Sequence, residues 1–122
     1  MPGTVLLVED DPDVLDILYY ILADAGYQVT RSDGHDVMHR IAELPPGLIL
    51  LDHRLQVAWG ADICRRLKNS ESTRAIPVIM MSATMYLEET AKTAGADDHL
   101  AKPFDLEDLL NKVGRHLQTN QP

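Results

Sequence analysis

The apolar run 48–51, which stops at Asp52, constrains the fold of this chain more than any other stretch. Four consecutive apolar residues predict a strand that is covered on both faces, as in the parallel sheet of an α/β protein. Asp52 then lies at the carboxyl end of that strand. In open α/β sheets this edge is where ligands bind. The side chains that the other strands bring to the same edge therefore carry the functional prediction.

Strand and helix patterns alternate along the rest of the chain. Short apolar or β-branched runs predict further strands at 5–8, 27–30, 77–81 and 99–101, with 27–30 at an edge of the sheet. Apolar residues at helical spacing predict helices at 12–25, 60–67, 84–94 and 106–117, and one more after Asp33, which we expect to cap it. Five strand–helix repeats with short connections predict an α/β, doubly wound fold: a five-stranded parallel sheet with helices on both faces.

Composition narrows the class of protein. The chain has 122 residues, of which 45% are hydrophobic, so we expect one ordered domain over 1–122 with its core at about 4–117. A net charge of −8 argues against a nucleic-acid surface. No run is long enough for a membrane span and no basic or apolar leader precedes the first strand, so we expect a cytoplasmic protein without a membrane partner. The single Cys64 fits a reducing compartment, and its place on an apolar helix side predicts a small core residue.

Charged and hydroxyl side chains follow four of the predicted strands. These are Glu9, Asp10 and Asp11 after the first strand, Asp52 after the third, Ser82 after the fourth and Lys102 after the fifth. Carboxylates forced together repel one another, so such a group is stable only with a cation among them. Oxygen ligands without His or Cys predict a hard ion, which in cells is Mg²⁺. Asp11 fits a solvated helix start as well as a ligand, and we leave it out of the predicted metal site.

A metal ion with a lysine opposite suits the binding of a phosphoryl group. The ion neutralises phosphoryl oxygens, Lys102 pairs with another, and the Ser82 hydroxyl donates to the remaining one. An aspartate carboxylate is a competent nucleophile for phosphoryl transfer and forms an acyl phosphate. Asp52, flanked by the other groups, is the predicted acceptor.

From about Thr4 to Leu117, the chain resembles the receiver domain of two-component response regulators. The motifs that carry this resemblance are 7–11 (LVEDD), 50–52 (LLD) with Gly60 eight residues on, 81–83 (MSA), 95–98 (GADD) and 102–104 (KPF). Each motif alone is weak, but all five in this order are specific. The resemblance implies a flavodoxin-like, chemotaxis-regulator-like fold with strand order 2-1-3-4-5. It also implies a cis peptide bond between Lys102 and Pro103.

The resemblance implies roles for individual residues. Glu9, Asp10, Asp52 and the backbone carbonyl of Arg54 would hold Mg²⁺. A histidine kinase or histidine phosphotransfer protein would donate the phosphoryl group to Asp52, and Ser82 and Lys102 would receive it. Ser82 and His99 would act as the switch that changes the face made by the last two helices and the last strand.

The sequence departs from the family pattern at four places. Gln56 replaces the usual proline after Asp52, which predicts a less rigid loop. The helix after Ser82 is about two residues short. His99 stands where an aromatic switch residue is usual, and Arg54 occupies the position that shields or admits attacking water. These changes leave the chemistry in place and bear on the output mechanism.

The leading functional prediction is a phosphoacceptor signalling switch of a two-component or phosphorelay pathway. Its catalysis is limited to self-phosphorylation and slow self-dephosphorylation, so we do not expect an enzyme. The alternative is a phosphorylation-independent docking module with the same fold, motivated by Gln56 and His99. A metal-dependent phosphatase is disfavoured because Arg54 stands where that chemistry needs a general acid. We expect a downstream protein effector or fused output domain, and a monomer or weak phosphorylation-dependent dimer; kinase, output and pathway are not encoded in these motifs.

Overall fold

Five parallel strands form a single sheet within residues 3–119, the part of the chain that the computed structural model describes. The strands are β1 (Thr4–Val8), β2 (Gln28–Ser32), β3 (Leu48–Asp52), β4 (Val78–Ser82) and β5 (Asp98–Ala101). The helices are α1 (Pro12–Asp24), α2 (Val37–Glu43), α3 (Gly60–Asn69), α4 (Leu87–Ala94) and α5 (Leu106–Thr119). The strand order is β2-β1-β3-β4-β5, which confirms the predicted fold and the edge position of the second strand. Within residues 3–119 none of the helices combines the length and hydropathy needed to cross a membrane.

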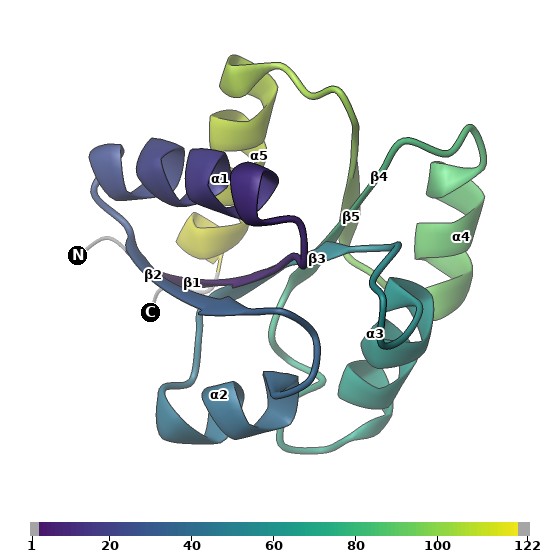
Figure 1. The fold of residues 1–122 in the computed structure, drawn as a ribbon. Coiled ribbons are helices and arrows are strands. Elements are labelled where there is room, and N and C mark those ends of the chain that lie inside the picture. The colour runs from purple at the N-terminus through teal and green to yellow at the C-terminus, as the bar shows by residue number, and fades with distance from the viewer. Residues whose placement is uncertain (1–2, 120–122) are drawn as a thin grey trace.

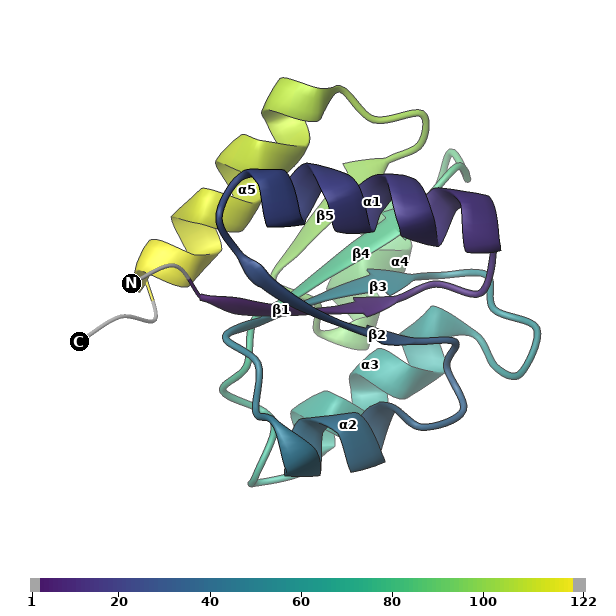
Figure 2. The same cartoon turned by 60° about the vertical axis from the view of Figure 1, so that its left-hand side comes forward.

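Helices cover the sheet on both faces. Figures 1 and 2 show α1 and α5 on one face and α2, α3 and α4 on the other. Strand residues alternate between the two faces, because successive side chains of a strand point to opposite sides. Leu50 packs with the helices α1 and α5, and its neighbours Ile49 and Leu51 pack with the other three. All five residues of β3 are buried, as the apolar run predicts.

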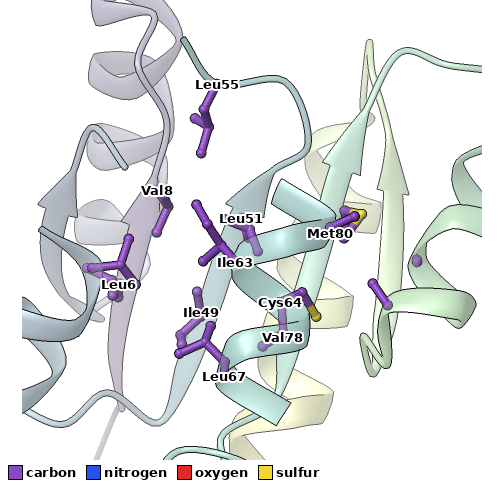
Figure 3. Packing of buried hydrophobic residues seen from close by; sticks show 14 of the residues in the cluster. Leu6, Val8, Ile49, Leu51, Leu55, Ile63, Cys64, Leu67, Val78 and Met80 are labelled. Carbon is purple, nitrogen blue, oxygen red and sulfur yellow. The ribbon is translucent and has the colours of Figure 1, made fainter. Parts of the chain in front are cut away.

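The larger of the two core layers lies under α3, as Figure 3 shows. Ile63, Cys64 and Leu67 of that helix face Ile49 and Leu51 of the central strand. Cys64 is fully buried, which confirms its prediction as a core residue, and burial raises the pKa of its thiol to about 11. The core therefore fixes β3 rigidly and, with it, the position of Asp52.

The structure corrects two predicted helix starts. Helix α2 begins after Asp36 and not at Asp33, whose carboxylate instead accepts hydrogen bonds from His35. Both aspartates suit a cap by residue type, and the first one lies too far from the apolar stripe of the helix. Helix α4 begins at Leu87, three residues after the predicted start at Thr84. Its end is as predicted, with Gly95 in the left-handed region at φ +86°.

Candidate functional site

Three carboxylates converge at the carboxyl edge of the sheet. Val8 pairs with Leu51 across β1 and β3, so Glu9, which follows β1, lies beside Asp52 at the end of β3. Glu9, Asp10 and Asp52 each offer an oxygen, and these oxygens all lie within 4.8 Å of one another. Glu9 and Asp52 are buried, whereas Asp10 is half-buried. The predicted acidic group is thus assembled from residues more than 40 positions apart by the parallel pairing of the sheet.

Lys102 reaches the same carboxylates from the end of β5. Its Nζ lies 2.8 Å from Asp52 Oδ1 and 2.9 Å from Glu9 Oε1. The Lys102–Pro103 peptide bond is cis, as the resemblance implies. The ammonium group therefore bridges the two buried carboxylates at the base of the site.

Burial and charge oppose each other at this ion-paired group. Burial, helped by the neighbouring Asp52 charge, raises the pKa of Glu9 to about 7, although Lys102 acts to lower it. Burial alone would lower the pKa of Lys102, but its hydrogen bonds to Asp52 and Glu9 more than offset this and raise it. One ammonium group does not compensate the negative charge of this site fully, which favours a further cation.

Ser82 lies at the end of β4, between the strands that carry Asp52 and Lys102. Its hydroxyl oxygen accepts a hydrogen bond from the backbone N–H of Thr84 at 3.1 Å, and its carbonyl accepts one from the Lys102 N–H at 2.9 Å. The residue is 7% exposed. The hydroxyl is thus held at the edge of the sheet by the turn that leads toward α4.

A cleft of about 740 Å³ lies over these residues. It is lined by all the predicted acidic, hydroxyl and lysine side chains and by Arg54. His99 is not among its lining residues; its backbone carbonyl accepts a hydrogen bond from Lys112 at 2.6 Å. The structure therefore brings the predicted chemical groups together and leaves the predicted switch residue His99 apart from them.

The sequence leaves open whether Trp59 covers part of the site or contacts a partner, and the structure places it among the residues that line the cleft. Sequence patterns missed three further lining residues: Thr84, Tyr86 and Thr90. They come from the loop and the helix after β4, where no periodic pattern marks them. His53 is half-buried in the cleft wall, with its ring centroid 5.2 Å from that of Trp59. Its position directly after Asp52 was the available signal.

The other residues that the sequence left open also have defined places. Asp11 caps α1, because its carboxylate accepts from the N–H groups of Asp13 and Val14. The side chain of His116 is 18% exposed, and its Nε2 lies 2.9 Å from Asp98 Oδ2. Gly60 is required by close packing, since a Cβ there would overlap the Asp52 carbonyl and lie 2.7 Å from the His53 Cα.

The doubly wound sheet, with three acids and a lysine at its carboxyl edge, places this chain in the class of receiver-type α/β domains. The chain belongs to the response regulator receiver domain family, whose model matches residues 5–114. It is similar to RpaA of Synechocystis sp., named a DNA-binding dual master transcriptional regulator, with 38% identity over 89% of this chain and 46% of RpaA. It is also similar to PhoB of Escherichia coli, the phosphate regulon transcriptional regulatory protein, with 31% identity over 93% of this chain and 51% of PhoB. The chain thus spans about half the length of these relatives.

Solved structures agree with this assignment. A response regulator from Chloroflexus aurantiacus superposes with a TM-score of 0.91 at 30% identity, covering 97% of this chain and 99% of the other. The receiver domain of a sensor histidine kinase from Pseudomonas aeruginosa superposes with a TM-score of 0.87 at 30% identity, again covering 97% and 99%. That structure has a magnesium ion coordinated in its active site cleft.

Proposed function

We propose that this domain is a phosphoacceptor switch of a two-component or phosphorelay pathway, with Asp52 as the acceptor. The observation that carries the proposal is the Lys102 ammonium bridging Asp52 and Glu9 at the base of an acidic cleft. A lysine in this place would pair with a phosphoryl oxygen once the phosphoryl group is attached to Asp52. Membership of the receiver family, for which phosphoacceptance is general, supports the same conclusion.

The acidic residues fit a divalent ion. The cluster offers carboxylate oxygens with no nitrogen or sulfur ligand, and one Lys does not neutralise it. We propose that Glu9, Asp10, Asp52 and the backbone carbonyl of Arg54 hold Mg²⁺. When bound, the ion would neutralise charge on the phosphoryl oxygens.

The proposed chemistry at Asp52 is a single phosphoryl transfer. A carboxylate oxygen of Asp52 forms a bond to phosphorus while the bond from phosphorus to the donor imidazole nitrogen of a histidine kinase or phosphotransfer protein breaks. Lys102 then pairs with a phosphoryl oxygen, and the Ser82 hydroxyl donates to another. Attack of water on phosphorus returns the Asp52 carboxylate and inorganic phosphate, so the only catalysis is self-phosphorylation and slow self-dephosphorylation.

Phosphorylation would change the conformation of the elements next to Ser82. We propose that acceptance of the phosphoryl group draws the Ser82 hydroxyl inward and, with His99 of β5, changes the face made by α4, β5 and α5. The receiving partner would be a protein effector or a fused output domain. The receiver domain itself would act as a monomer or as a weak phosphorylation-dependent dimer. The names of RpaA and PhoB support an output in transcription. A cytoplasmic location fits the free, buried Cys64 thiol.

Labelling with a small acyl phosphate tests this function. We expect the purified domain to become phosphorylated by acetyl phosphate in the presence of Mg²⁺, measured by phosphate-affinity electrophoresis, and to stay unlabelled in EDTA. Asp52→Asn should abolish the labelling, whereas Asp24→Asn at the end of α1, away from the cleft, should not. An unlabelled wild-type domain, or equal labelling of Asp52→Asn, would contradict the proposal.

A further inference from the structure

Asp10 differs from the other two carboxylates of the acidic cluster in its contacts. Lys102 forms ion pairs with Glu9 and Asp52, whereas Asp10 accepts a hydrogen bond from the backbone N–H of Gln56. The Gln56 nitrogen lies 2.6 Å from Asp10 Oδ2, which is short even for a hydrogen bond to a charged acceptor. The contact joins the end of β1 to the loop that follows β3.

The loop that carries this N–H group is fixed on both sides of Gln56. The preceding Leu55 is 8% exposed and belongs to the core cluster, where Figure 3 shows it at the top. Arg54 and Trp59 pair across the loop as an antiparallel bridge. The sequence-based expectation of a less rigid loop therefore overlooked that residue 56, not being proline, supplies a backbone donor toward Asp10.

The loop also packs tightly against the connection after β2. A Cβ on Gly34, which has φ +107°, would lie 3.0 Å from a Val57 methyl group and 3.2 Å from a Leu55 methyl group. The glycine therefore lets the two loops approach closely. This packing restrains the residues on both sides of Gln56.

We propose that the Gln56 backbone N–H positions Asp10 as a ligand of the metal ion, holding Oδ2 and leaving the second carboxylate oxygen for the ion. The inference rests on the Mg²⁺ site of the proposed function. Hydrogen bonds to a ligating carboxylate fix its orientation, and their loss typically lowers metal affinity about 10–100-fold. Without the donor, Asp10 would have to be ordered against the repulsion of Glu9 and Asp52 when the ion binds.

The donor is a backbone group, so only proline removes it. Gln56→Ala retains the N–H and is the matched control for loss of the side chain. Proline is the residue that the family resemblance implies at this position, which makes Gln56→Pro compatible with the fold. Chemical denaturation of both variants checks that they are folded.

The first measurement is the affinity of each protein for Mn²⁺, from the electron paramagnetic resonance signal of the free ion. We expect Gln56→Pro to bind about 10-fold more weakly than the wild type, and Gln56→Ala to stay within about twofold of it. Equal affinity of Gln56→Pro and the wild type would overturn the inference while leaving the proposed function intact. A wild type that binds no Mn²⁺ would instead overturn the proposed metal site, and the inference with it.

The second measurement compares the wild type with Asp10→Ala and so does not depend on the proline variant. We expect the amide proton of Gln56 to resonate far downfield in ¹H–¹⁵N spectra and to move upfield in Asp10→Ala. The amide proton of Gly60, which donates to the His53 carbonyl at 2.6 Å, serves as the internal reference and should move much less. A Gln56 amide shift that is indifferent to Asp10→Ala would overturn the inference.

Discussion

Glu9 is the most deeply buried of the charged residues at the site. It is 1% exposed, and its carboxylate shares one ammonium group with Asp52. Burial raises the pKa of Glu9 to about 7, compared with its ordinary value of 4.5. Between these two pH values, Glu9 is protonated in the folded protein and ionised in the unfolded chain. The contribution of Glu9 to the free energy of unfolding should therefore fall as the pH rises from 4.5 to 7.

Replacement of Glu9 by Gln tests this pH dependence. In metal-free buffer, the unfolding free energy of the wild type relative to Glu9→Gln should rise by about 2 kcal/mol when the pH is lowered from about 7.5 to about 5. Urea denaturation at a series of pH values measures it. Glu88→Gln, on the exposed first turn of α4, controls for the loss of any carboxyl group. If the unfolding free energy of the wild type minus that of Glu9→Gln stays constant with pH, or grows toward high pH, the pKa of Glu9 is not raised in the folded protein.

Among the contacts between elements, those of Asp98 fasten β5 to α5. Its carboxylate lies 2.8 Å from Arg115, 2.9 Å from His116 and 3.7 Å from Lys112, all on the same helix. Burial alone would raise the pKa of Asp98, but the His116 hydrogen bond, the His99 backbone N–H and the positive charges of Lys112 and Arg115 together lower it. The ionised form thus holds in register the strand whose end carries Lys102.

Asp98→Asn should lower the free energy of unfolding by about 1 kcal/mol at neutral pH, because the helix loses its charged acceptor. A lowered pKa contributes stability above the ordinary pKa of Asp, and that stability is lost as the pH falls through the folded value. The difference between the wild type and the variant should therefore shrink below about pH 4. Asp108→Asn, whose half-exposed carboxylate lies 3.9 Å from Lys112, is the matched control and should have a smaller effect. Equal losses for the two variants would contradict the role of Asp98.

How far the elements follow from the sequence depends on their pattern. Strands such as β3 and β4 were predictable because an uninterrupted apolar run of this length, bounded by polar or turn residues, is typical of a buried strand. The convergence of Asp52 and Lys102 followed from parallel pairing alone. The start of α2 was not predictable, since Asp33 and Asp36 both suit a cap and only packing selects between them.

Hydrogen bonds made by backbone groups in loops could not be predicted from the pattern of side chains. The sequence marks Gln56 only by the absence of the usual proline, and the acceptor of its N–H is set by the approach of β1 to the loop after β3 in the fold. His53 and Trp59 likewise gain their place in the cleft from the turn of that loop, which the sequence marks only by Gly60. Sequence patterns therefore do not determine the places of residues whose roles come from loop geometry.

In the molecule as a whole, the sheet acts as a frame that gathers groups from four strands at one edge. Core packing on both faces fixes β3, and with it Asp52, while the cleft lies over the strand ends and the loops that follow them. The face of α4, β5 and α5 is next to Ser82 and Lys102 along the chain. In the proposed switch, a chemical change at Asp52 would reach that face through Ser82 and Lys102.

Chemical mapping of the phosphorylated carboxylate is the decisive experiment for the proposed acceptor. Borohydride reduces an aspartyl phosphate to homoserine, and mass spectrometry of the digested protein then locates the modified residue. After treatment with acetyl phosphate and Mg²⁺, we predict homoserine at position 52 alone, and none in the sample treated in EDTA. Reduction at Asp10 or Asp11, or no reduced residue in the Mg²⁺ sample, would contradict the assignment of Asp52 as the acceptor.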